Sequence, residues 1–250
     1  MIIARVPSGI PGFDAVIQGG IPSNSTVALR ANPSNVTEYF QQQFIMEGLK
    51  QGSPGIYCCL ARSPANVIMS LKQQGFDPLE QIANDQLILV DFYSLLARAS
   101  VVGVDQAVQK KIISVTEVDD ERLLQDGLAT AVERISNLKG LRAVCENVTG
   151  ILTGKDAIEI MRWGRKAFAD LRTFETVTLH TFPIGTREDL FALMANDFDS
   201  ILEIQSDTNG GRTRYNLNVQ KMRLTEIPTA PLALEAEGSL LSLKTEQRIT

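Results

Sequence analysis

The sequence predicts an α/β fold with a mostly parallel sheet covered by helices on both faces. Short apolar runs alternate with longer amphipathic segments along most of the 250 residues, which is typical of strands buried between two helix layers. The pattern changes near the end, where residues 207–212 have the sequence DTNGGR, which favours a tight hairpin. We therefore expect a parallel sheet extended by a C-terminal antiparallel hairpin.

The individual elements follow from apolar content, β-branched residues and helical periodicity. The expected strands are Thr26–Ala31, Ile56–Leu60, Leu87–Phe92, Arg142–Glu146, Thr176–Thr181, Ser200–Gln205 and Arg214–Gln220. The expected helices are Thr37–Gln51, Pro64–Gln74, Glu121–Asn137 and Asp156–Leu171.

Two segments allow more than one interpretation. Ala97 to Asp120 has no clear period and is either a solvated connection or a partner-binding segment. After Pro228, two short apolar runs predict either an edge hairpin on the core or a strand that docks on a neighbouring chain.

Length and composition indicate one globular unit over residues 1–250, with a core at about 5–234 and a tail at 235–250. The hydrophobic content of 44% is sufficient for a large core. No apolar run approaches the roughly 20 residues of a membrane span, and no signal-peptide pattern precedes the first strand. We expect a cytoplasmic protein of an archaeon or bacterium.

Charge and cysteine usage narrow the classes of partner. The formal net charge of −5 offers no general attraction to nucleic acid. Cys58, Cys59 and Cys145 lie in apolar runs and are interpreted as small buried hydrophobic residues in a reducing compartment. We expect no metal site, and we expect an unidentified protein partner or a homo-oligomer rather than nucleic acid or membrane.

The first 29 residues contain the most specific pattern. The run SGIPGFD over residues 8–14 is followed by GGIP over 19–22 and by the apolar strand Thr26 to Leu29. This order resembles the opening of KaiC-type ATPases, members of the RecA-like P-loop family, over about Arg5 to Leu234. The resemblance implies a RecA-like fold with a mainly parallel sheet and a C-terminal hairpin.

The phosphate-binding positions of that family are substituted here. Its G-x-x-x-x-G-K-[ST] loop corresponds to residues 31–38, with the sequence ANPSNVTE. Ala31 and Val36 replace the two glycines that let backbone N–H groups surround phosphate. Thr37 replaces the phosphate-binding lysine, and Glu38 replaces the hydroxyl that binds Mg²⁺. We expect Glu38 to suit the start of a helix and to repel a triphosphate.

Two further catalytic positions of the family also differ. The resemblance places a pair of glutamates after the second expected strand, one of which activates the attacking water, and Ala61 and Arg62 stand there. The acidic residue that orders the metal-bound water corresponds to Glu146, where aspartate is usual. We interpret Glu146 as a strand-end carboxylate that caps the next loop.

Three separate losses favour a pseudo-ATPase. The main hypothesis is a non-catalytic KaiC-like regulator or scaffold that acts through protein contacts, with no catalytic residue and no bound cofactor. ATP and Mg²⁺ would then bind only in an atypical mode. The alternatives are an atypical ATP-binding or weakly hydrolysing enzyme, and a recombinase-paralogue accessory factor that contacts DNA.

Some polar residues outside these motifs are also candidates for function. Lys221 and Arg223 resemble the family's K-x-R segment, which contacts the nucleotide of the next subunit, although Leu224 replaces the small residue that usually follows. They are interpreted either as intersubunit cations, with Glu38 as one candidate partner, or as exposed strand-end charges. The single histidine, His180, is expected to face the nucleotide edge of the sheet and is interpreted as a hydrogen-bonded histidine at the end of a strand.

Overall fold

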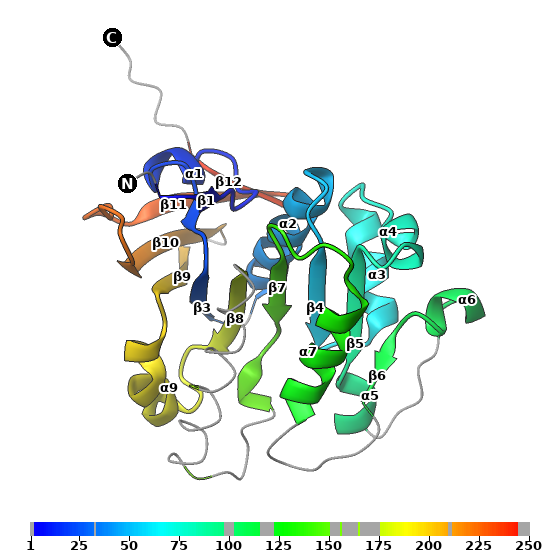
Figure 1. Ribbon diagram of the computed structural model, residues 1–250. Helices are drawn as coiled ribbons and strands as arrows, with labels where there is room; N and C mark the ends of the chain where they lie inside the picture. Colours follow the sequence, from blue (N-terminus) through cyan, green and yellow to red (C-terminus); the bar gives the residue numbers. More distant parts are fainter. Residues whose placement is uncertain are drawn as a thin grey trace.

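The computed structural model describes residues 3–32, 34–97, 103–115, 123–150, 156, 165, 176–209 and 212–244. Ten strands form one sheet in the order β12-β11-β10-β9-β3-β8-β7-β4-β5-β6 (Figure 1). The seven strands from β9 to β6 in this order are parallel, and β10, β11 and β12 join antiparallel. The predicted fold class is therefore confirmed.

The strand bounds agree closely with the apolar runs of the sequence. The strands of the large sheet are β3 (Ser25–Ala31), β4 (Gly55–Cys59), β5 (Leu87–Asp91), β6 (Ile113–Ser114), β7 (Arg142–Cys145), β8 (Val177–Pro183), β9 (Ser200–Asn209), β10 (Arg212–Met222), β11 (Leu232–Glu237) and β12 (Leu240–Leu243). A separate antiparallel pair is formed by β1 (Arg5–Val6) and β2 (Ile21–Pro22).

The helices are less regular in length than the sequence suggests. The described α-helices are α1 (Phe13–Val16), α2 (Asn35–Lys50), α3 (Pro64–Gln73), α4 (Leu79–Ala83), α5 (Tyr93–Leu96), α6 (Gln106–Gln109), α7 (Leu123–Arg134) and α9 (Glu188–Met194). The helix expected at Asp156–Leu171 lies outside the described residues, apart from single positions. Within Ala97–Asp120 the structure has α6 and the edge strand β6, which pairs in parallel with β5.

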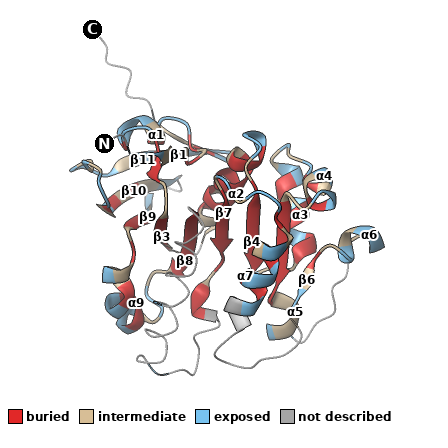
Figure 2. Ribbon diagram, viewed as in Figure 1, coloured by how far each residue is buried: buried red, intermediate tan, exposed pale blue. Residues whose placement is uncertain are grey.

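Alternating side chains give the sheet two hydrophobic faces. Residues of α2 and α3 pack on one face with Tyr57, Leu89 and Leu179, whereas α7 packs on the other face with Ile56, Cys58 and Val90, and α9 packs there too. The central strands are buried between these layers (Figure 2). The near-continuous apolar runs of the sequence predicted these strands correctly, because both faces of each strand are covered by helices.

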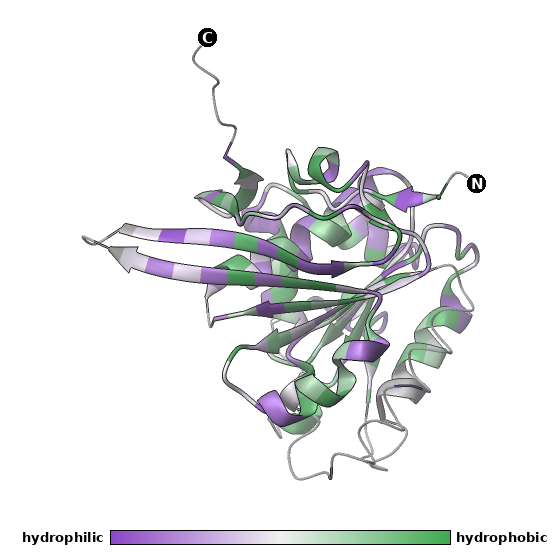
Figure 3. Ribbon diagram, turned by 90° about the vertical axis from the view of Figure 1, so that its left-hand side faces the viewer, coloured by the Kyte–Doolittle hydropathy of each residue, from purple (hydrophilic) through white to green (hydrophobic). Residues whose placement is uncertain are grey.

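The C-terminal strands extend the sheet in two ways. β9 and β10 project beyond the other strands as a long hairpin (Figure 3), since residues 205–209 pair with β10 and lie past the β3 partners of β9. β11 and β12 form an edge hairpin on β10, which confirms the first of the two interpretations of the tail. The core boundary expected at about residue 234 falls inside β11.

Helix α2 is buried on most sides, and three consecutive glutamines connect it to its surroundings. Gln41 donates to the hydroxyl of Thr181 in β8 at 3.1 Å. The amide of Gln43 donates to the carbonyl of Leu241 and accepts from its N–H at 3.0 and 2.6 Å. This two-point contact pairs the outer edge of β12 with a side chain, as a strand would do, and fixes the hairpin on α2.

A buried arginine fixes the other end of α2. The side chain of Arg142 in β7 is almost fully buried, lies over the ring of Phe44, and donates at 2.7 Å to the carbonyls of Pro7 and Phe44. Burial lowers the pKa of Arg142 to about 10. Gly48 provides the space, because a Cβ there would lie 2.5 Å from Arg142 Nε.

We expect Gly48→Ala to lower the free energy of unfolding by about 1–3 kcal/mol, because Arg142 is held by two carbonyls and cannot move away from the added methyl group. The gain in helix propensity of about 1 kcal/mol offsets only part of this cost. Urea denaturation measures this change in the free energy of unfolding. In an Arg142→Met background, Gly48→Ala should lower the free energy of unfolding by less. An unchanged effect of Gly48→Ala in that background would contradict the steric explanation.

Candidate functional site

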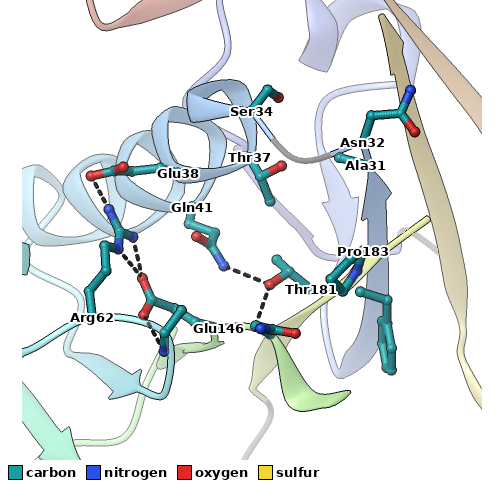
Figure 4. A pocket seen from close by; sticks show the side chains of 13 residues that line it. Ala31, Asn32, Ser34, Thr37, Glu38, Gln41, Arg62, Glu146, Thr181 and Pro183 are labelled. Carbon is teal, nitrogen blue, oxygen red and sulfur yellow. Dashed lines mark hydrogen bonds and ion pairs between the residues drawn. The ribbon is translucent and has the colours of Figure 1, made fainter. Parts of the chain in front are cut away.

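A cavity lies where four parallel strands end. The carboxyl ends of β3, β4, β7 and β8 meet at one edge of the sheet, because parallel strands share a direction, and this edge is where open α/β sheets bind ligands. The cavity measures about 240 Å³ and is covered by the start of α2 (Figure 4). Its lining residues are Ala31, Asn32, Ser34, Thr37, Glu38, Gln41, Ala61, Arg62, Glu146, Asn147, Thr181, Phe182 and Pro183.

Three substituted motif positions form one ion-pair network in this cavity. The guanidinium of Arg62, which follows β4, contacts Glu38 of α2 through one terminal nitrogen and Glu146, just after β7, through the other. Arg62 Nε also lies 3.1 Å from Glu146 Oε1. Figure 4 shows the guanidinium between the two carboxylates. The fold thus joins Arg62 to Glu146, which are 84 positions apart in the sequence.

Neutral donors hold Glu146 independently of the cation. The Tyr57 hydroxyl donates to Glu146 Oε1 at 2.7 Å, and the Ala61 N–H donates to Oε2 at 3.3 Å. The side chain of Glu146 is only 3% exposed, so its charge depends on these contacts. The sequence suggested that Glu146 caps its own following loop, but the carboxylate instead binds the loop after β4.

Glu38 is oriented by polar side chains from two helices. Ser70 of α3 donates to Glu38 Oε1 at 2.5 Å, and Gln42, one turn further along α2, donates to the same oxygen at 3.2 Å. Gln42 in turn accepts from Ser70 at 3.0 Å and also from Gln74. This polar chain links the cavity to α3.

The network keeps its central cation charged. Burial alone would lower the pKa of Arg62, but Tyr57, Glu146 and Glu38 together raise it above its usual range. Burial, followed by the charge of Glu146, also raises the pKa of Tyr57 well above its usual value, so the phenol remains a neutral donor. Two carboxylates around one guanidinium leave the group with one unbalanced negative charge.

The loop before α2 has an ordinary backbone. Helix α2 begins at Asn35, two residues earlier than expected, and Val36 is buried in the core instead of lining a phosphate cradle. Among the described residues of 31–38, none has a positive φ. An anion-binding nest needs alternating right- and left-handed residues, so this loop lacks the geometry that the family's glycines provide.

The lining residues do not fit a metal-bound triphosphate. Arg62 is the one cation among them, and it is already paired with two carboxylates. Thr37 lines the cavity where a phosphate-binding lysine would stand. In the part of the chain that the structure describes, no group of three or more His, Cys, Asp or Glu side chains is arranged to hold a metal ion.

Lys221 and Arg223 lie far from this cavity within the chain. Met222, at the end of β10, pairs with Ser200, and Ser200 pairs with Val27 near the start of β3, whereas the cavity lies beyond the end of β3. Lys221 donates to the carbonyl of Asn196 at 3.2 Å. Arg223 donates to the carbonyls of two residues in the turn before β3, Ser23 and Asn24, at 3.1 and 3.0 Å. A contact between either cation and Glu38 would therefore require a second copy of the chain.

His180 is hydrogen-bonded as expected, but the expectation that it faces the nucleotide edge is wrong. Successive residues of a strand point to opposite faces, so Thr181 faces the cavity and His180 faces the other layer. His180 Nε2 lies 3.1 Å from Thr178 Oγ1, and its ring packs near Phe198. The three cysteines are buried and form no disulfide, as predicted for Cys58, Cys59 and Cys145.

Several residues of the site were not singled out from the sequence. Tyr57, Gln41, Ser70 and Thr181 all support the network or the cavity wall. One signal was available, because three consecutive glutamines in a helix that packs in the core require buried partners.

Among the described residues, no helix is both long and apolar enough to cross a membrane.

Comparison with known proteins places this architecture in a family. The family model described as "ATPase: KaiC" matches residues 6–247, so the chain belongs to the KaiC-like ATPase family. A UPF0273 protein of Thermotoga maritima is 28% identical over 90% of this chain and 89% of its own length. A UPF0273 protein of Pyrobaculum aerophilum is 30% identical over 90% of this chain and 77% of its own length.

A solved structure supports the fold. The crystal structure of a KaiC-like protein from Pyrococcus horikoshii superposes with a TM-score of 0.77 at 20% identity, and the match covers 98% of this chain and all of that one. The chain therefore has the RecA-like fold of that family, with relatives in both archaea and bacteria.

We expect Arg62→Ala to lower the free energy of unfolding, measured by urea denaturation, by about 3 kcal/mol. The substitution leaves the carboxylate of Glu146 buried without a cation. Adding Glu146→Gln should restore part of the loss. Lys72→Ala, which removes one member of an exposed ion pair with Asp77, should cost less than about 1 kcal/mol and serves as the control. Equal costs for Arg62→Ala and Lys72→Ala would contradict a buried network.

Proposed function

We propose that this chain is a non-catalytic member of the KaiC-like family that acts as a regulator or scaffold through protein–protein contacts. The observation that carries the proposal is the Glu38–Arg62–Glu146 network. It joins the three positions at which catalytic relatives would need a metal-binding hydroxyl, a general base and an acidic metal-water ligand. An ion-paired arginine at the base position has no role in activating water.

Electrostatics supports weak nucleotide binding. Phosphoryl transfer depends on positive charge around the phosphates, supplied by a lysine and Mg²⁺. Here the cavity has one arginine between two carboxylates, and its net charge is negative. A triphosphate entering this edge would meet like charge, because Arg62, the one cation among the described lining residues, is already paired with two carboxylates.

We expect ATP·Mg²⁺ to bind no more tightly than roughly millimolar, about three factors of ten weaker than a micromolar P-loop site. Steady-state phosphate release should stay at the buffer background, since neither Ala61 nor Arg62 can act as the general base. Calorimetry and a phosphate-release assay measure the two quantities on the native chain.

The matched variant is Thr37→Lys combined with Glu38→Thr, which returns a cation and a hydroxyl to the loop. It should bind ATP·Mg²⁺ at least about tenfold more tightly than the native chain. Low-micromolar binding or steady turnover by the native chain would reject the non-catalytic proposal and favour the atypical ATPase.

Self-association is the second part of the proposal. The unbalanced negative charge of the network is complementary to the cations Lys221 and Arg223, which lie near the opposite end of β3, when two copies are arranged head to tail. In such a contact Lys221 would approach Glu38 of the next copy. Arg62 already pairs with Glu38 inside the chain, so the cation of the neighbour would add to that pair and not replace it.

We expect light scattering to show an oligomer in the absence of nucleotide, and Lys221→Glu to lower its mass by placing like charges together. Lys72→Glu, at an exposed position of α3, should leave the mass unchanged. A monomeric native chain, or an oligomer insensitive to Lys221→Glu, would remove this part of the proposal.

A further inference from the structure

Leu224, in the turn after β10, presents an apolar side chain to solvent in a backbone conformation that leucine rarely adopts. The residue is 59% exposed, the highest value among the large hydrophobic residues that the structure describes. Its φ of 54° lies in the left-handed region, which favours glycine. Neither feature stabilises the isolated chain. Strained residues of this kind cluster at binding and switch sites, where the surrounding contacts hold them in place.

The turn that carries Leu224 is fixed by hydrogen bonds to other parts of the chain. Arg5 donates at 3.0 Å both to the carbonyl of Leu224 and to the hydroxyl of Thr225. That hydroxyl donates in turn to the carbonyl of Arg223 at 3.1 Å, and the N–H of Arg223 donates to the carbonyl of Asp199 at 2.9 Å. The exposed leucine is thus held in one position before any partner binds, which lowers the entropy cost of binding.

The cavity at the opposite end of β3 has a wall that suits an apolar side chain. Ala31, Thr37 and Pro183 line its neutral side, across from Glu38 and Arg62 (Figure 4). Its volume of about 240 Å³ gives room for the isobutyl group of one leucine. The cavity therefore combines an uncharged wall with an acidic one.

A cation close to Leu224 matches the acidic wall. Lys221 lies three residues before Leu224, donates to the carbonyls of residues 195 and 196, and forms no ion pair among the described residues. The ion-pair network of the cavity has one unbalanced negative charge. Because the turn and the cavity lie at opposite ends of β3, one chain cannot bring them together, whereas two copies arranged head to tail can.

We propose that Leu224 of one copy inserts into the cavity of the next copy, beside the ion-pair network, with its apolar side chain against Ala31 and Pro183. The inference rests on the proposed function, because it names the group that occupies this cavity in the self-association proposed above. Burial of the leucine supplies an apolar contribution to the contact, and Lys221 adds charge complementarity to Glu38. Each copy then contributes one turn and one cavity.

The first test compares two exposed apolar side chains. We expect Leu224→Ala to raise the dissociation constant of the oligomer at least about tenfold in light scattering across a concentration series, because the buried area of the leucine is lost. The matched control is Met69→Ala on α3, a residue that is 57% exposed and is removed from the turn and from the cavity lining. It should leave the dissociation constant unchanged.

Leu224→Gly separates association from folding. Glycine adopts a positive φ without strain, so the urea midpoint of this variant should not fall below that of Leu224→Ala, measured at a concentration where both are monomers. Its dissociation constant should nevertheless be as high as that of Leu224→Ala. A weaker oligomer made from an equally stable chain excludes misfolding as the cause.

A mixing experiment identifies the turn and the cavity as partners. Leu224→Asp places a like charge opposite the network, and Thr37→Phe narrows the cavity, so each variant alone should be monomeric. Their mixture should form a dimer with one copy of each, because the turn of the Thr37→Phe chain and the cavity of the Leu224→Asp chain are both intact. Light scattering measures the mass of each sample.

The inference is overturned if Leu224→Ala and Met69→Ala have the same effect, if Thr37→Phe alone still associates, or if the mixture stays monomeric. An oligomer that depends on Lys221 and not on Leu224 would retain the proposed self-association and remove the inserted leucine. A monomeric native chain would remove both. The non-catalytic part of the proposed function is decided separately, by ATP binding and turnover of the native chain.

Discussion

A buried carboxylate is the constraint on which this edge of the molecule depends. Glu146 is almost fully enclosed and directly follows the central strand β7. An ionised carboxylate in such a place needs a cation and hydrogen-bond donors. Arg62 supplies the charge, and Tyr57 supplies a neutral donor from the neighbouring strand. Because these three groups belong to β4, β7 and the loops after them, the charge balance of one side chain fixes the relative position of two loops.

Helix α2 transmits this constraint to the rest of the fold. Glu38 in its first turn joins the ion-pair network, and Gln41, Gln42 and Gln43 contact β8, α3 and β12. Side chains at successive helix positions are about 100° apart, so three consecutive residues reach three different neighbours. A helix that is enclosed on most sides is thereby held by polar contacts of defined geometry, in addition to apolar packing that tolerates sliding.

The fold could be predicted from the sequence more fully than the site. Apolar strands such as β4 and β5 agree with their predicted bounds within about one residue, because burial on both faces leaves a continuous apolar run. Glu38, Arg62 and Glu146 were identified separately as substituted positions, but local patterns contain no information about contacts across more than 80 residues. His180 was misplaced because the face of a strand changes at every residue, so an error of one position moves a side chain to the opposite layer.

The parallel sheet explains how family membership and altered chemistry coexist. Strand order and direction bring the carboxyl ends of β3, β4, β7 and β8 together whatever side chains they carry. The fold therefore determines where these side chains meet, and it does not determine which reaction they catalyse. In a catalytic relative the charges at such a point would be balanced only when ligand binds, whereas here most of the balance is made by the chain itself. The ion pairs of Arg62 with Glu38 and Glu146 therefore hold this edge together from within the chain.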